Sequence, residues 1–478
     1  MEPRARLFRV VFFLALLAAC SRNPVTGERQ LALISQEQEL QIGRQAAQQV
    51  ESSIGLVQDE ALQAYVQEVG ASIAADSERP GLPWTFRVVD DPTPNAFALP
   101  GGFIFVTRGL LGYMDSEAEL ATVLGHEIAH VTARHSVEQI SRSQLAQLGL
   151  GLGMIFLPEI RQYSGLFSAG LELLFLRNSR DAERQADELG FGYALARDYD
   201  VREMTDIFAT LQRIAEREGG SPLPVWASTH PDPGERIETI QARVAELGPR
   251  ADELHLRREP FMERIDGLVW GADPRQGFFE QNVFLHPELA FRMVFPQGWR
   301  TQNLPHAVVA VSPRQDAVMQ LTLAQGDPVE AVKKFLSQSN VQAGQAARQE
   351  INGLPAALAT FTAQTEQGPI YGLITFVAHG EATYRIVGFA PVSNYESMAP
   401  TFLETAESFA PLTDPKVLGV QPQRLDIVTI ERAMSIEEFA RAYPSAVDVG
   451  TLVLINQVPD AKTVMPAGTP VKRVVAGK

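Results

Sequence analysis

The stretch from His126 to His130 constrains this chain most, because its two histidines can reach one metal ion only if the segment is a helix. Residues four apart on a helix lie one turn from each other on the same face. Ser116 and Glu119 form a capping-box pattern ahead of the stretch, and apolar residues follow at helical spacing. The sequence therefore predicts a helix that presents His126 and His130 to one zinc ion, with Glu127 beside them as a general base.

A third metal ligand is expected downstream, because a catalytic zinc usually takes three protein ligands and keeps a fourth position for water. The best candidate is Glu183, in the charged stretch 179–188, with Asp187 one helical turn later. Asp187 could accept the outer N–H of a zinc-bound imidazole and fix its tautomer. The alternative for this stretch is a solvated helix face, since runs of charged residues are usually exposed.

Two other interpretations concern the histidines themselves. His126 and His130 could instead form hydrogen bonds inside a packed core without any metal. His135 follows His126 by nine residues, which is about 180° around a continuous helix, so it is not expected to bind the same ion. A position at the surface, or a position behind the ligands, is expected for His135.

Two further motifs give these residues a family resemblance. They are Asn95-Ala96-Phe97-Ala98-Leu99-Pro100-Gly101-Gly102 and Ser228-Thr229-His230-Pro231. Together with the pattern 126–130 and the stretch 179–188, they resemble the gluzincin metalloendopeptidases of the CAAX prenyl protease type. Within that family the chain is most similar to periplasmic lipoprotein members of Gram-negative bacteria. The resemblance covers about residues 23–245.

The resemblance implies a set of roles. The zinc ligands would be His126, His130 and Glu183. Glu127 would be the catalytic base, and His230 and Arg236 would lie near the metal. His230 would regulate or assist the site, and His230 or Arg236 would be an additional hydrogen-bond donor to the oxyanion.

The implied reaction is hydrolysis of peptide bonds by zinc-activated water, with unfolded or misassembled envelope proteins as substrates. Residues 102–107 are expected to form an edge strand beside the zinc cleft, to which extended peptides would add. A plain core strand is the alternative for these residues. The alternative function is a non-proteolytic assembly factor or chaperone that uses the zinc domain as a docking scaffold.

Length and pattern predict an α+β chain of several domains, because 478 residues exceed one ordinary core. A signal peptide is predicted over residues 1–19, and a mainly helical zincin-type metallopeptidase domain over residues 20–260. Residues 275–412 show strand-like runs and two helices, which predict a mixed antiparallel sheet that resembles the PsbP fold. Residues 413–478 resemble a LysM module, which would bind peptidoglycan. They lack the usual early Gly-Asp turn, so a small βαβ docking domain is the alternative.

The N-terminus predicts export. Arg4, Arg6 and Arg9 precede an apolar run at 10–19, which is too short to span a membrane. The run ends at Cys20, the only cysteine of the chain, in a sequence that resembles the lipobox of bacterial lipoproteins. Lipidation of Cys20 would anchor the protein to the periplasmic face of the outer membrane, with the outer-membrane assembly machinery as an expected partner. The formal net charge of −16 argues against nucleic-acid binding.

Overall fold

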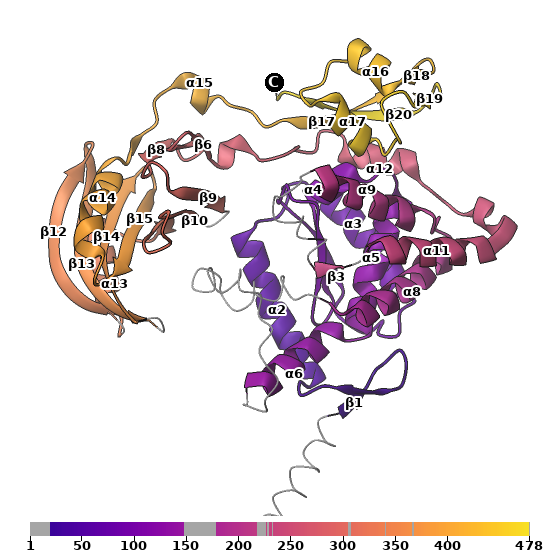
Figure 1. The fold of residues 1–478 in the computed structure, drawn as a ribbon, viewed down its shortest axis with the longest axis horizontal. Coiled ribbons are helices and arrows are strands. Elements are labelled where there is room, and N and C mark those ends of the chain that lie inside the picture. The colour runs from indigo at the N-terminus through magenta and orange to yellow at the C-terminus, as the bar shows by residue number, and fades with distance from the viewer. Residues whose placement is uncertain are drawn as a thin grey trace, which may run out of the picture. The chain divides into compact units, whose positions relative to one another are not determined.

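The computed structural model describes residues 20–147, 178–217, 226, 229–231, 233–304, 307–339, 341–365 and 368–477. Figure 1 shows the elements of its two compact units. Each unit has its own hydrophobic core. The first unit runs to Gly271 and also includes Gln423–Val475, and the second spans Ala272–Pro422. The predicted signal peptide at 1–19 lies outside the described residues. Among the helices that are described, none is both long enough and apolar enough to cross a membrane.

The first unit is mainly helical, as predicted. Its helices begin at polar side chains that accept the backbone N–H groups left free in a first turn, as Asp59 does for α3 and Ser179 for α8. The helices described here are α2 (Gln36–Ser53), α3 (Glu60–Ala74), α4 (Arg108–Tyr113), α5 (Glu117–Thr132), α6 (His135–Gln147), α8 (Arg180–Ala196), α9 (Glu203–Arg217), α11 (Pro233–Leu247), η2 (Gly248–Glu253) and α12 (Arg258–Ile265).

A three-stranded sheet lies beside these helices, in the order β3 (Thr85–Val89), β5 (Phe103–Thr107) and β4 (Ala96–Leu99). β3 is parallel to β5, and β4 is antiparallel to it. The edge-strand prediction for residues 102–107 is therefore wrong, because β5 is the central strand and all five of its residues are buried. Its continuous apolar run favours burial on both faces. The strand at one edge of the sheet is β4, which is also apolar and contacts α5.

Helix α5 carries the predicted metal motif and is buried along its whole length. The side chain of Ser116 accepts the backbone N–H of Glu119, as the capping pattern predicts. The Glu119 carboxylate instead accepts the backbone N–H of Asp115, one residue before the cap, so the predicted capping box is only half formed. The helix ends at Thr132, and Arg134 follows with a φ of 60°.

The C-terminal segment does not form a separate module. β17 (Arg424–Thr429) pairs with β20 (Pro470–Val475), and β18 (Met434–Ser435) pairs with β19 (Val464–Met465). The helices α16 (Ile436–Ala442) and α17 (Val449–Ile455) follow β18 in the sequence and precede β19. Its apolar residues, including Leu425, Phe439 and Val474, share one core with Leu110 and Leu111. The boundary predicted at residue 413 therefore differs from the structure, because residues 423–475 bury their apolar face within the first unit. A short hairpin of β1 (Cys20–Arg22) and β2 (Arg29–Leu31) starts this unit.

The second unit contains the predicted antiparallel sheet. Its strand order is β12-β13-β14-β15-β11-β10-β9, with a second sheet in the order β16-β8-β7-β6. The elements are η3 (Pro274–Gln276), β6 (Phe278–Glu280), β7 (Val283–His286), β8 (Phe291–Val294), β9 (Arg300–Leu304), β10 (Ala307–Val311), β11 (Val318–Ala324), α13 (Pro328–Leu336), β12 (Val341–Ile351), β13 (Leu354–Thr365), β14 (Gly368–His379), β15 (Ala382–Pro391), α14 (Tyr395–Glu407), β16 (Ala410–Pro411) and α15 (Pro415–Leu418).

The two longer helices of the second unit cover opposite faces of its large sheet. Along β14, Ile374 packs in the cluster that contains Val332 of α13, whereas Leu373 packs in the cluster that contains Phe402 of α14. Successive side chains of a strand point to opposite faces, so neighbouring positions separate the two helices. The α+β class predicted for this chain is confirmed.

Candidate metal centre

The predicted ligands converge on one buried point. The Nε2 atoms of His126 and His130 lie 3.0 Å apart. The Glu183 carboxylate of α8 reaches the same point, with Oε2 3.6 Å from Nε2 of His126 and Oε1 3.4 Å from Nε2 of His130. All three side chains are almost fully buried. The structure therefore brings together two residues of one helix and a third that is more than fifty residues away in the sequence.

These separations fit a zinc ion. Zinc bonds to nitrogen or oxygen ligands are about 2.0–2.1 Å long, so two ligand atoms of a tetrahedral site lie about 3.3 Å apart. The measured separations of 3.0, 3.4 and 3.6 Å bracket that value. Two imidazoles and a carboxylate are also a donor set that zinc commonly takes. The group with His230 is a cluster whose donor atoms all lie within 4.8 Å of one another.

Two glycines allow the ligand-bearing helices to approach closely enough. A Cβ atom added to Gly190 would lie 2.6 Å from the backbone nitrogen of His126, and one added to Gly125 would lie 2.9 Å from the carbonyl oxygen of Gly190. Helices α5 and α8 thus pack backbone to backbone at this point. Glu183, Asp187 and Gly190 follow at helical spacing on one face of α8. The sequence interpretation missed both glycines, although one directly precedes His126 and the other continues that face.

Asp187 lies behind His126 rather than at the convergence point. Its Oδ1 is 3.0 Å from Nδ1 of His126, which is the contact that the sequence suggested. Arg236 of α11 donates to both carboxylate oxygens, through Nε at 2.6 Å and Nη2 at 2.7 Å. Burial alone would raise the pKa of Asp187, but the hydrogen bonds from Arg236 and His126 lower it. Asp187 is therefore a charged acceptor for the outer nitrogen of His126.

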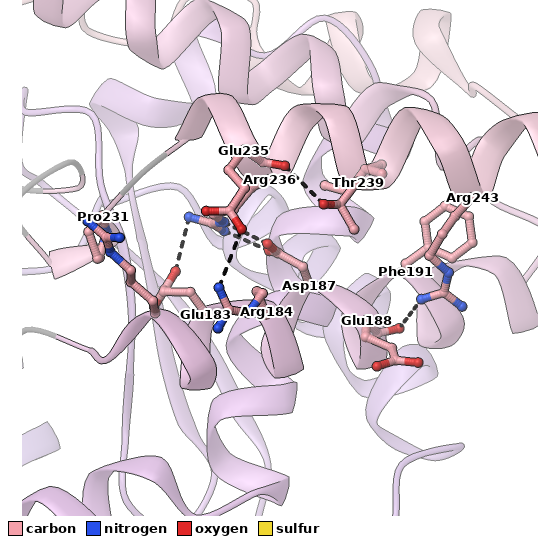
Figure 2. A pocket seen from close by; sticks show the side chains of 12 residues that line it. Glu183, Arg184, Asp187, Glu188, Phe191, Pro231, Glu235, Arg236, Thr239 and Arg243 are labelled. Carbon is pink, nitrogen blue, oxygen red and sulfur yellow. Dashed lines mark hydrogen bonds and ion pairs between the residues drawn. The ribbon is translucent and has the colours of Figure 1, made fainter.

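Arg236 also reaches the carboxylate of Glu183, since its Nη1 lies 3.0 Å from Oε2. Figure 2 shows Arg236 beside Glu183 and Asp187, at a pocket of about 290 Å³ lined by residues of α8 and α11. The guanidinium lies over the ring of Phe208 at 4.4 Å and is almost fully buried. Arg236 therefore holds two carboxylates in place instead of pointing into open solvent.

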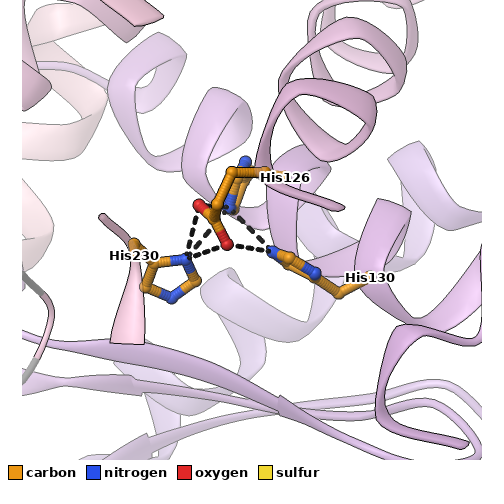
Figure 3. Close-up of side chains that lie close together, drawn as sticks. His126, His130 and His230 are labelled. Atoms are coloured by element: carbon orange, nitrogen blue, oxygen red, sulfur yellow. Dashed lines mark hydrogen bonds and ion pairs between the residues drawn. The ribbon is translucent and has the colours of Figure 1, made fainter. Parts of the chain in front are cut away.

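His230 is in direct contact with two of the predicted ligands, His126 and Glu183. Its Nδ1 is 3.3 Å from Nε2 of His126 and 3.0 Å from Oε2 of Glu183 (Figure 3). The indole of Trp226 stacks on its ring at 5.3 Å. Burial would raise the pKa of Glu183, yet the imidazoles of His230 and His130 hold that pKa well below its usual value. His230 is thus a potential fourth donor at the same point.

Glu127 is buried beside this group and does not belong to it. Its Oε1 lies 3.7 Å from Nε2 of His230, and its carboxylate accepts a hydrogen bond from the backbone of Ala98 in edge strand β4. Burial raises the pKa of Glu127 to about 7. A carboxyl group with a pKa near neutrality can both accept and return a proton.

His135 lies behind the predicted metal ligands, which is one of the two positions expected for it. The other expected position was the surface. The reasoning that placed it opposite His126 assumed a continuous helix, and that assumption is wrong because α5 ends at Thr132. His135 begins α6 and is buried, with its Nδ1 2.8 Å from Nδ1 of His130. Burial lowers the pKa of His135 to about 3.

Cys20, the predicted lipidation site, lies in β1, where it pairs with Leu31.

Comparisons with known proteins found relatives that are named as peptidases. A model of peptidase family M48 matches residues 60–244. The mitochondrial metalloendopeptidase OMA1 of Schizosaccharomyces pombe is 34% identical over 253 residues, which are 52% of this chain and 74% of that protein. The putative beta-barrel assembly-enhancing protease of Vibrio cholerae is 29% identical over 245 residues, which are 48% of this chain and 50% of that protein.

Several solved structures are similar to part of the chain, all of them weakly. The solution structure of cyanobacterial PsbP from Synechocystis aligns with 28% of this chain and 94% of its own, at 12% identity and a TM-score of 0.24. A likeness this weak does not assign a fold, so the resemblance to PsbP stays a prediction.

Proposed function

Because the chain belongs to peptidase family M48 and is a zinc-dependent metalloprotease, we propose that it is an endopeptidase of unfolded or misassembled envelope proteins. The observation that carries the proposal is the convergence of His126, His130 and Glu183 on one buried point, with Glu127 alongside. The three converging residues would hold the zinc ion. The chemistry supplied by the bound ion is polarisation of the scissile carbonyl and a lowered pKa of water.

Glu127 would act as the general base. It lies next to the donor cluster without belonging to it, so its carboxylate stays free to take a proton from the attacking water. The same carboxyl group would then give that proton to the leaving amine. Arg236 and Asp187 would act indirectly, because Asp187 orients the ring of His126 and Arg236 holds Asp187 and Glu183 in place.

Substrate would bind along β4. Within the described residues β4 pairs with β5 and with no other strand, so its outer edge would add an extended peptide backbone. Its residue Ala98 contacts Glu127, so a peptide at this edge would lie beside the base. Main-chain pairing demands little of the side chains, which suits a protease of unfolded proteins.

His230 would restrain the site. A catalytic zinc keeps one position open for water, and His230, whose Nδ1 lies 3.3 Å from Nε2 of His126 and 3.0 Å from Oε2 of Glu183, would compete with water for the ion. The site would become active when His230 moves away, and His230→Ala should therefore cleave faster than the wild type.

The primary test measures zinc content by elemental analysis and cleavage of casein, for the wild type and for Glu127→Gln. We expect near-stoichiometric zinc in both proteins and cleavage by the wild type alone, because glutamine keeps the shape of Glu127 and removes the base. His230→Ala is assayed in parallel to detect a closed resting site. Zinc in every variant with cleavage in none would favour the non-proteolytic scaffold function, and a wild type without zinc would refute the site.

The proposed location is the periplasmic face of the outer membrane, through lipidation of Cys20. The name of the Vibrio cholerae relative supports an envelope role and the outer-membrane assembly machinery as a partner. Cys20→Ala should lose incorporation of a labelled fatty acid and leave the membrane fraction. Peptidoglycan binding by the C-terminal segment is tested by retention of the full chain on purified peptidoglycan, and release of all the protein in the wash would exclude it.

A further inference from the structure

The two histidines of the metal motif have different partners behind them. Nδ1 of His126 faces the charged carboxylate of Asp187, at 3.0 Å. Nδ1 of His130 faces a second imidazole, that of His135, at 2.8 Å. Nε2 of His135 then lies 2.9 Å from Oε1 of Gln185. A continuous chain of hydrogen bonds therefore runs from His130 through His135 to α8.

The order of donors in this chain follows from its two ends. Nε2 of His130 is the atom that faces the metal point, so it must offer a lone pair there. A neutral His130 then carries its hydrogen on Nδ1 and donates it to Nδ1 of His135. His135 in turn carries its hydrogen on Nε2 and donates it to the carbonyl oxygen of Gln185. Nδ1 of His130 and both ring nitrogens of His135 are then paired, and these hydrogen bonds require no charged group.

The backbone turn after α5 makes this contact possible. On a continuous helix His135 would point away from His130. The helix ends at Thr132, and Arg134 adopts a left-handed conformation that returns the chain to the site. Arg134 is held there by Glu39 of α2, at 2.9 Å, and by the carbonyl oxygen of Ile34, at 3.1 Å.

We propose that His135 is a positioning residue for zinc, which with Gln185 holds the ring of His130 in the tautomer and orientation that bind the ion. This inference rests on the proposed zinc site. Helix α8 would then supply the ligand Glu183, the outer partner Asp187 of His126, and Gln185, which holds His135. Loss of such a partner typically weakens metal affinity by about 10–100-fold.

The test compares two substitutions that separate hydrogen bonding from packing. His135→Phe keeps a ring of similar shape and removes the acceptor, whereas His135→Asn loses the ring and keeps an oxygen that can accept from His130. Zinc affinity is measured by competition with a chelator on the purified full chain. The Nδ1–H signal of His130 is followed by NMR on histidine labelled with ¹⁵N, with zinc bound.

A matched control is Ser141→Ala, which removes a buried hydroxyl from the same helix. Ser141 bonds to the backbone at Val137 and Leu33, not to the donor cluster. We expect the control to bind zinc like the wild type. The thermal midpoint of each metal-free variant shows whether it is folded.

We expect His135→Phe to bind zinc about 10–100-fold more weakly, with a shifted and faster-exchanging Nδ1–H signal, and His135→Asn to recover part of the affinity. Gln185→Leu should show a smaller loss. If His135 only fills space, the order reverses, since phenylalanine would be tolerated and asparagine would not. Equal affinity of the wild type and His135→Phe would overturn this inference alone, whereas a wild type without zinc would overturn the proposed site as well.

Discussion

Lys472 should be one of the residues on which the stability of the first unit depends most. Its side chain is completely buried. Its Nζ lies 2.7 Å from Oδ1 of Asp115 and 2.7 Å from the carbonyl oxygen of Met114. Asp115 directly precedes the N-cap of α5. A residue of the C-terminal strand β20 therefore holds the start of the helix that carries the metal motif.

The size of the effect follows from what Lys472→Met leaves behind. Methionine keeps much of the aliphatic stem but removes the charge, and loss of one partner of a buried ion pair costs about 3–5 kcal/mol. Arg258 also contacts Asp115, with its Nη2 2.8 Å from Oδ2, so Asp115 would not be left without a cation. We therefore expect Lys472→Met to lower the free energy of unfolding by about 3 kcal/mol, at the lower end of this range.

Denaturant unfolding followed by tryptophan fluorescence measures this loss, because Trp84, Trp226 and Trp270 all lie in the first unit. The control is Lys462→Met, at an exposed lysine of the same segment, which should change stability by less than about 0.5 kcal/mol. Adding Asp115→Asn to Lys472→Met should cost less than the sum of the two single variants. A Lys472→Met protein as stable as the control would refute the reasoning.

Three further predictions concern close packing, pH and zinc. Gly190→Ala should lose about 1–3 kcal/mol of stability and bind zinc more weakly, because the added carbon would collide with the backbone of His126. Gly192→Ala is its control, since a Cβ atom there meets nothing within 4 Å, and equal zinc affinity of both variants would contradict the close approach. Burial lowers the pKa of His286 to about 4 from 6.5, so the neutral ring stabilises the fold above pH 6.5, and up to about 3 kcal/mol is lost as the pH falls from 6.5 to 4. His286→Asn should flatten this part of the stability profile measured by denaturant unfolding, and an unchanged profile would exclude the effect. Removal of zinc by a chelator should lower the thermal midpoint of the wild type and leave that of a His126→Ala variant unchanged, because only a protein with bound metal loses binding free energy.

Local patterns explain where the sequence interpretation succeeded. The strand-like runs predicted within residues 275–412 form an antiparallel sheet, because the apolar character of each strand and the turns between strands depend on neighbouring residues. The cap at Ser116 and the spacing of His126 and His130 are likewise properties of one helix. Glu183 and Asp187 lie one turn apart on α8, and that spacing suggested both of them as partners of the metal motif.

The errors concern features that depend on contacts between distant segments. Residues 103–107 became a central strand because β4 and β3 both pair with them, and the strand's own pattern did not show which side would be covered. His135 was placed on the wrong side because Arg134 ends the helix in a turn that distant Glu39 stabilises. The C-terminal segment looked independent because its partner surface lies more than three hundred residues earlier.

The sequence by itself indicated the chemistry of this protein, since two histidines one turn apart on one helix, with a glutamate beside them, predict a zinc site and its general base. Tertiary structure decided what surrounds these residues: the approach of α8 at Gly190, His230 next to His126, and His135 behind His130. The physical reason is the distance along the chain over which each kind of interaction acts. Helical spacing and capping act over a few residues, whereas close packing and buried charge pairs join side chains whose order in the chain says nothing about their distance.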